Sequence, residues 1–134
     1  MTQDAFSPSW LALREAVDHR SRAPSLTSRL RREWQTRQWT RIVDLGAGTG
    51  SNLRYLAPRL SEPQAWTLVD HDAELLERLE APRGVGSVTT VLGDLDAQGL
   101  AAVGEADLVT GSALLDLVTE DWLRRLVDAC AAAS

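Results

Sequence analysis

Several residue types are scarce or missing in this 134-residue chain, and each absence excludes a class of protein. The single cysteine, Cys130, excludes an internal disulfide, and no Cys/His pair has zinc spacing, so we expect no metal site. The absence of lysine excludes a P-loop lysine. No apolar run approaches the ~20 residues of a membrane span, and the N-terminus lacks the features of a signal peptide, so we expect a cytoplasmic, soluble protein.

Charge is divided unevenly along the chain. Residues 1–41 carry eight arginines against four acidic residues, a net charge of +4, whereas residues 42–134 carry six arginines against fifteen acidic residues, a net charge of −9. Two interpretations of the basic segment stay open: it attracts an anionic substrate, or it is a solvated helix face packed against an acidic domain. We favour the second.

The pattern of apolar residues predicts two kinds of structure. Residues 1–40 have no strand signal and predict two helices, the first starting at Ser7-Pro8-Ser9 and broken by Pro24, which together form a cap or lid. From residue 41 onward, short apolar strands alternate with helices, which predicts an α/β fold with a doubly wound parallel sheet. The expected strands are 41–45, 66–70, 88–92 and 107–110, and the expected helices are one carrying Leu53, Leu56 and Leu60, then 73–79 and 120–133.

Acidic and small residues stand where each expected strand ends, which is where open parallel sheets bind ligands. A carboxylate at Asp44, beside a glycine loop, would repel a pyrophosphate and suits a ligand with an ammonium group. The implied ligand has a cationic amino group, a ribose and a base. The strand ends carry Asp44 with Gly46-Ala47-Gly48-Thr49-Gly50, Asp70-His71, Gly93-Asp94-Leu95 and Gly111-Ser112-Ala113.

The run Val43-Asp44-Leu45-Gly46-Ala47-Gly48-Thr49-Gly50 resembles the first motif of the class I S-adenosylmethionine-dependent methyltransferases. The resemblance covers roughly residues 41–130 and implies a Rossmann-like sheet, here of about four strands in the order 3-2-1-4. Since the family's sheet normally has seven strands, residues 41–134 are expected to form an S-adenosylmethionine-binding domain truncated after strand four. Strand four then lies at an open edge, which makes a homo-oligomer possible.

The resemblance also implies a role for each residue of the site. The glycine loop, Gly46, Ala47, Gly48 and Gly50, would approach the methionine part of the cofactor S-adenosyl-L-methionine, and Asp44 would face its amino group. Asp70 would accept both ribose hydroxyls, His71 would flank the adenine, Asp94 would bond the adenine amino group beside the Leu95 backbone, and Ser112 would lie where strand four opens onto cofactor and substrate. Alternatives stay open: a plain tight turn for the glycines, a helix cap for Asp70, an ordinary turn aspartate for Asp94, and an exposed loop histidine for His71.

Nothing in the sequence specifies the methyl acceptor or a catalytic motif. We expect a small-molecule acceptor, with nucleic acid and membranes not expected as partners, and name Asp116 as a weak candidate base, with a loop acid or helix cap as its alternative. A degenerate cofactor-binding or scaffold module without transferase activity is the alternative function. The tryptophans at 10, 34, 39 and 122 are expected to pack rather than to form a substrate cage.

Overall fold

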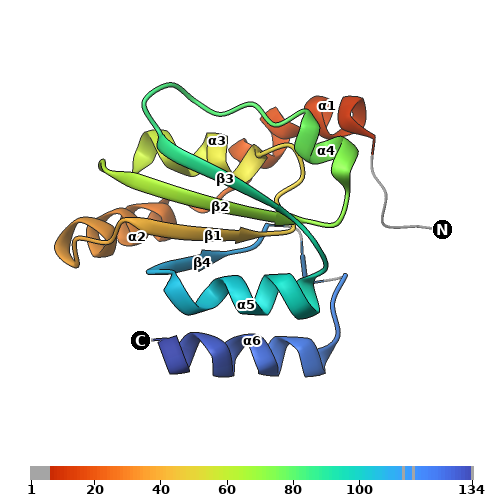
Figure 1. The fold of residues 1–134 in the computed structure, drawn as a ribbon. Helices are drawn as coiled ribbons and strands as arrows, with labels where there is room; N and C mark the ends of the chain where they lie inside the picture. The colour runs from red at the N-terminus through yellow and green to blue at the C-terminus, as the bar shows by residue number, and fades with distance from the viewer. Residues whose placement is uncertain (1–6, 113, 116, 134) are drawn as a thin grey trace.

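The computed structural model describes residues 7–112, 114–115 and 117–133. Its centre is a parallel sheet in the order β3-β2-β1-β4, with helices on both faces (Figure 1). This confirms the α/β class, the strand order and the N-terminal helices predicted above. The strands are β1 (Arg41–Leu45), β2 (Gln64–Asp70), β3 (Gly86–Leu92) and β4 (Leu108–Thr110).

Alternation along β1 divides the core into two layers. Ile42 points to one face of the sheet and packs in a cluster with Trp66, Leu53 and Trp34, while Val43 and Leu45 point to the other face. Each of these side chains is almost fully buried, because successive residues of a strand project to opposite faces and both faces of a parallel sheet are covered.

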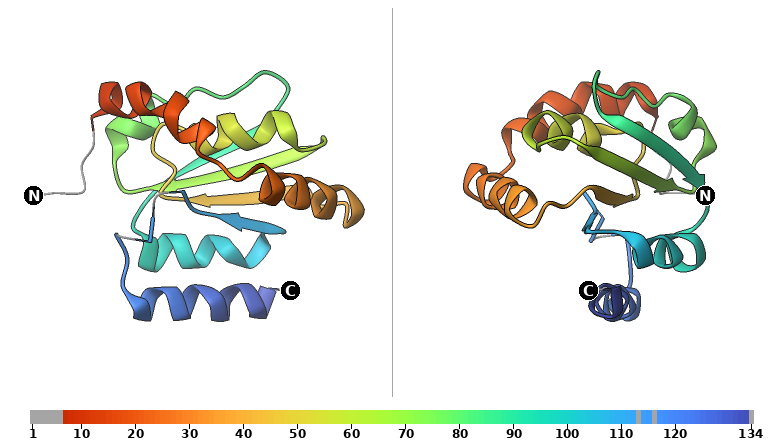
Figure 2. Two further views of the ribbon diagram at one scale, coloured as in Figure 1. Left: turned by 180° about the vertical axis from the view of Figure 1, so that it is seen from behind. Right: turned by 60° about the vertical axis from the view of Figure 1, so that its left-hand side comes forward.

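Helices α1 (Pro8–Arg20), α2 (Pro24–Thr36), α3 (Ser51–Leu56) and α4 (Ala73–Glu77) come before β3 in the chain, and α1, α3 and α4 lie on one side of the sheet (Figures 1 and 2). Ser7 caps α1 by accepting a hydrogen bond from the backbone N–H of Trp10 at 3.1 Å, and Pro24 opens α2, as the sequence predicts. Trp34 is buried and donates to the carbonyl of Ser61 at 2.9 Å. Trp10 is 41% exposed and lies outside the core clusters, with the Arg14 guanidinium 5.0 Å from its ring centroid.

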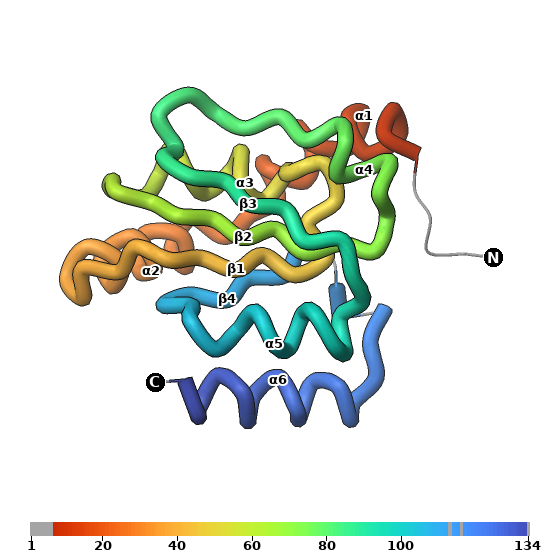
Figure 3. The backbone as a smooth tube through the Cα atoms, viewed as in Figure 1, coloured from red at the N-terminus to blue at the C-terminus, as the bar shows by residue number. Residues whose placement is uncertain are grey.

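A helical segment on the opposite face was not predicted. It runs through η2 (Leu95–Gly99), α5 (Leu100–Ala102) and η3 (Val103–Glu105), and α6 (Glu120–Ala133) lies beside it (Figure 3). The two glycines, Gly99 and Gly104, weaken the helical signal, and the hydrogen-bond pattern changes twice within eleven residues, from π to α to 3-10. The short loop between β3 and η2 carries Asp94, which follows the carboxyl end of β3.

β4 pairs only with β1 among the described residues, so it lies at an edge of the sheet as expected. Its residues Leu108 and Val109 are half-buried rather than exposed, because each packs against one of the two core clusters. Self-association through this edge stays a prediction. In the ranges given above, no helix has the length and apolar character needed to cross a membrane.

Candidate functional site

The glycine loop follows β1 and is held against the end of β2 by its backbone. The N–H groups of Gly46 and Ala47 both donate to the carbonyl of Val69, at 2.9 and 3.1 Å, and the N–H of Gly48 donates to Oδ2 of Asp70 at 2.8 Å. The loop is therefore fixed at three successive positions before any ligand binds.

Two of the loop glycines have different reasons to be glycine. Gly50 has φ +92°, and a Cβ there would collide with the side chain of Leu79. Gly48 has φ +58°, yet a Cβ there would meet nothing closer than Leu11 and Leu75, each at 3.9 Å. Gly50 thus serves packing, whereas Gly48 leaves room beside the loop for a ligand to approach the backbone.

Asp44 is the buried acid of the site, with 1% of its surface exposed. Its Oδ1 accepts hydrogen bonds from the Thr110 hydroxyl at 2.8 Å and from the Asn52 amide at 3.1 Å, and that same amide donates to Thr110 Oγ1 at 3.0 Å. Asp44 Oδ2 and Asn52 Oδ1 are buried with no hydrogen-bond partner among the described residues. An unpaired buried oxygen is costly, so these two oxygens have unused capacity to accept hydrogen bonds.

Burial raises the pKa of Asp44 from 3.8 to about 6. Hydrogen bonds from Thr110 and Asn52 and the positive charge of Arg22 oppose this rise, while the charge of Asp70 adds to it. A cation bound beside Asp44 would favour its ionised form.

Asp70 stands at the end of β2, and both of its oxygens are already engaged. Oδ2 accepts from the N–H of Gly48, and Oδ1 accepts from the N–H of Asp72 at 2.8 Å. A carboxylate has about four acceptor positions, so capacity for two further hydroxyl donors remains. The exposed His71 lies beside it, with Nδ1 3.7 Å from Oδ1 of Asp70, and Asp72 caps α4.

The end of β3 is less specific. Asp94 is exposed, and its Oδ1 accepts from the N–H of Ala97 at 2.7 Å, so it caps the segment that begins at Leu95. The Leu95 side chain packs against the core cluster that contains Val43 and Leu45. Its carbonyl accepts a hydrogen bond from the indole N–H of Trp122 at 3.0 Å. This capping role was not among the alternatives considered for Asp94, which were a cofactor contact and an ordinary turn aspartate. A cofactor role for Asp94 and Leu95 stays a prediction.

Arg22, from the turn between helices α1 and α2, contacts the end of β4. Ser112 is exposed, and its hydroxyl accepts a hydrogen bond from Nη2 of Arg22 at 3.2 Å. Ala113 and Asp116, the latter the candidate base, lie outside the described residues. Asn52, Thr110 and Arg22 were missed as site residues by the sequence analysis. Asn52 offered a signal, because it is a polar residue at the start of a short apolar helix that follows the glycine loop.

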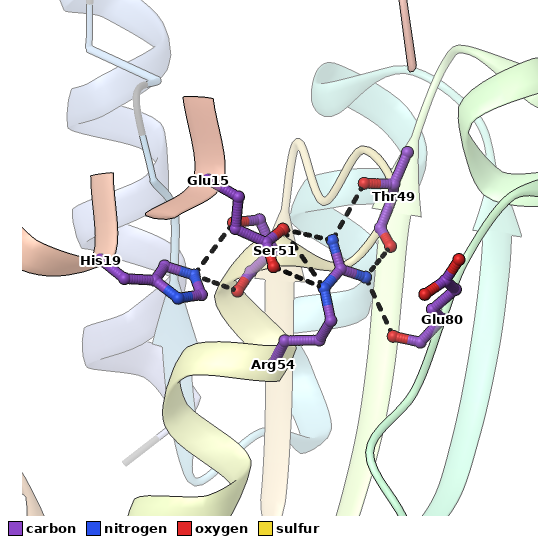
Figure 4. Close-up of polar contacts among 6 residues, drawn as sticks. All are labelled: Glu15, His19, Thr49, Ser51, Arg54 and Glu80. Atoms are coloured by element: carbon purple, nitrogen blue, oxygen red, sulfur yellow. Dashed lines mark hydrogen bonds and ion pairs between the residues drawn. The ribbon is translucent and has the colours of Figure 1, made fainter. Parts of the chain in front are cut away.

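Helix α1 is fastened to the glycine loop by an ion pair that the sequence did not reveal (Figure 4). Arg54 of α3 donates from Nε to Oε2 of Glu15 at 2.9 Å, and its Nη1 donates to the carbonyls of Thr49 and Glu80 at 2.6 and 2.9 Å. His19 Nε2 lies 3.2 Å from both the carbonyl oxygen and the hydroxyl of Ser51. The Arg54 guanidinium also holds the pKa of Glu15 below its ordinary value.

A parallel sheet in this order, with a glycine loop after its first strand and carboxylates at the first two strand ends, defines a Rossmann-like methyltransferase fold. The family model described as a methyltransferase domain matches residues 42–133. The chain therefore belongs to the methyltransferase domain family, in the class I S-adenosylmethionine-dependent group.

Solved structures agree with this assignment. The N-terminal domain of EvdMO1 with SAH bound is 26% identical at a TM-score of 0.59, and the match covers 84% of this chain and 47% of that one. CrArsM, an arsenic(III) S-adenosylmethionine methyltransferase from Chlamydomonas reinhardtii, is 25% identical at a TM-score of 0.53, covering 67% and 34%. CalS10, an amino pentose methyltransferase from Micromonospora echinaspora, shares the fold at 21% identity and a TM-score of 0.57, covering 99% and 54%.

The chain thus spans between 34% and 54% of the length of these three structures. A comparison with curated protein sequences gives no match.

Proposed function

We propose that this chain binds S-adenosyl-L-methionine at the ends of β1 and β2 and transfers its methyl group to a small-molecule acceptor. The pair of buried, unpartnered oxygens on Asp44 and Asn52 carries the proposal. An ammonium group has three N–H donors and a positive charge, which supplies what both oxygens lack, directly or through one water.

The remaining residues fit the other parts of the same ligand. Asp70 has free acceptor positions for a ribose diol, beside a Gly48 backbone that a ligand is able to approach. His71 is exposed next to Asp70, where a base would extend. The third acid, Asp94, is placed at the next strand end and would bond a base amino group with the oxygen that the cap leaves free.

When bound, the cofactor supplies a methyl group already activated on a sulfonium. What this chain must add is position and exclusion of water, because proximity accounts for much of the acceleration in such a displacement. Helix α1, fastened through Glu15 and Arg54, places Leu11 beside Gly48, where with a bound ligand it would help to exclude water. Ser112 is exposed after the end of β4, where it would contact an acceptor.

A small-molecule acceptor is supported by similar proteins, among which CrArsM acts on arsenic(III) and CalS10 on an amino pentose. The test is to incubate the chain with S-adenosylmethionine and, separately, the small-molecule and macromolecular fractions of a cell extract, and to quantify S-adenosylhomocysteine by mass spectrometry. We expect product with the small-molecule fraction and none with a Gly48→Val variant.

Product only with the macromolecular fraction would contradict the proposed acceptor class. Bound S-adenosylmethionine without product in either fraction would favour a cofactor-binding module that transfers nothing.

A further inference from the structure

A cavity of about 350 Å³ lies where the end of α1, the start of α2 and the end of α3 meet. Four arginines and a histidine line it, and none of its lining residues is acidic. It is separate from the glycine loop, and the cofactor site described above does not use it. The cationic lining residues are His19, Arg20, Arg22, Arg31 and Arg59.

Two of these guanidinium groups are held in place by one aromatic ring. Arg22 lies 4.5 Å and Arg59 4.1 Å from the centroid of the Tyr55 ring, each as a cation–π contact. Tyr55 is buried, and its hydroxyl lies 3.0 Å from Oγ1 of Thr27 in α2. The charges are therefore positioned before a ligand arrives, which reduces the entropy cost of binding one.

The cavity arginines have no ion-pair partner among the described residues, although the charge of Arg22 also acts on Asp44, which lies outside the cavity. Arg20, Arg22, Arg31 and Arg59 form no ion pair with any described residue, whereas Arg54, on the same helix as Tyr55, is paired with Glu15. Like charges gathered around one cavity repel each other, so an anion bound there would relieve the repulsion and gain charge-assisted hydrogen bonds. Among the residues that the structure describes, no carboxylate from residues 42–134 lines the cavity.

The cavity also adjoins the proposed cofactor site. Arg22, one of its lining residues, donates to Ser112 at the end of β4, and its charge acts on Asp44. His19, another, contacts Ser51 at the start of α3. A molecule anchored in the cavity by one group would reach past Arg22 toward Ser112 at the end of β4.

We propose that this cavity binds a phosphate group of the methyl acceptor, so that the acceptor is a phosphate-bearing small molecule. That the ligand is the methyl acceptor rests on the proposed function. That it carries a phosphate group rests on the cavity alone. A phosphate monoester carries a charge of about −1.5 to −2 near neutral pH and three acceptor oxygens, which matches several guanidinium forks better than a single carboxylate does.

The test is a calorimetric titration of the full chain with inorganic phosphate and with acetate at constant ionic strength. It compares wild type with Arg31→Gln, which removes one cavity charge, and with Arg32→Gln, a neighbouring exposed arginine of α2 outside the cavity. We expect phosphate to bind wild type more tightly than acetate, Arg31→Gln to weaken phosphate about fivefold or more, and Arg32→Gln to change it less than twofold.

Each other result overturns the inference. Equal losses in the two variants would indicate diffuse attraction to the basic segment, and no phosphate binding to wild type would remove the site. Tighter binding of acetate would replace phosphate by a carboxylate.

A second titration, with S-adenosylhomocysteine, separates this inference from the proposed function. Phosphate affinity that is unchanged in protein saturated with S-adenosylhomocysteine supports an acceptor site beside the cofactor. Displacement of phosphate by S-adenosylhomocysteine would place the anion in the cofactor site and overturn the proposal. If the chain binds S-adenosylhomocysteine but not phosphate, the proposed function stands and only the phosphate site is ruled out. If it binds phosphate but not S-adenosylhomocysteine, both the acceptor role of the cavity and the proposed function are contradicted.

Discussion

At the scale of single residues, Asp44 combines deep burial with an unpaired oxygen. Its carboxyl has a pKa of about 6 in the folded chain against 3.8 as the ordinary value, with burial as the main cause. Since the folded pKa is raised, Asp44 contributes stability that is fully present below about pH 4 and is lost as the pH rises through 6.

We therefore predict that wild type loses up to about 3 kcal/mol of unfolding free energy relative to Asp44→Asn between about pH 4 and pH 7. Chemical denaturation of both proteins across this range measures the difference. A parallel pH dependence in the two proteins would mean that the pKa of Asp44 is the same in the folded and the unfolded chain. Cofactor affinity in wild type is expected to rise over the same range, because the ionised carboxylate binds an ammonium group better.

Asp70 is the second residue with a direct prediction. Its carboxylate faces the proposed ribose site and also accepts from the N–H of Gly48, so Asp70→Ala removes a ligand contact and a loop contact together. We expect a loss of about 1.5–3 kcal/mol in cofactor binding, measured by calorimetry with S-adenosylhomocysteine.

The matched control is Asp72→Ala, which removes only the α4 cap. It should cost about 1 kcal/mol of stability and leave the affinity unchanged. Equal affinity in wild type and a folded Asp70→Ala would remove Asp70 from the site.

At the scale of elements, Gly48 is the position of the glycine loop where backbone conformation, rather than contact with a neighbouring side chain, requires glycine. Gly48 has φ +58° and only distant neighbours, so Gly48→Val introduces a strained β-branched residue and fills the approach to the loop. We expect cofactor binding to fall below detection while the helical circular dichroism stays nearly unchanged. Normal binding by this variant would reduce the loop to a plain turn.

The attachment of α1 gives a second prediction at this scale. Glu15→Gln weakens the pair with Arg54, which is only about one-fifth exposed, while Asp18→Asn weakens the exposed pair with Arg14 on the same helix. We expect Glu15→Gln alone to speed amide hydrogen exchange in Pro8–Arg20 and to lower stability by about 1–2 kcal/mol. Similar exchange in both variants would show that α1 is held by its apolar contacts instead.

Much of this arrangement could be predicted from the sequence, and the omissions have physical causes. Strands and the glycine loop carry local signals, so the order of elements and the positions of Asp44 and Asp70 were predicted. The segment Leu95–Glu105 was missed because its glycines and changing helix type erase the helical period. Contacts such as Arg54 with Glu15 and Arg22 with Ser112 join residues far apart in the chain, and a single sequence gives no signal for such pairs.

At the scale of the whole molecule, the uneven distribution of charge along the chain places acidic and basic groups in two different regions of the structure. The acidic strand ends, with Asp44 and Asp70, suit a donor that carries positive charge, and the basic end of the cap, around Arg22, suits an acceptor that carries negative charge. The two regions meet at Ser112, where Arg22 reaches the end of β4. Donor and acceptor would thus be attracted to opposite sides of one crevice.

The central claim is that the crevice selects an ammonium-bearing nucleoside over a dinucleotide. Calorimetric titration of the full chain with S-adenosylmethionine, S-adenosylhomocysteine and NAD tests it most directly, with Asp44→Asn as the matched variant. We predict that both adenosyl compounds bind, that NAD does not, and that Asp44→Asn weakens both adenosyl compounds at least tenfold, about 1.4 kcal/mol. Binding of NAD, or adenosyl affinities that do not depend on Asp44, would contradict the account.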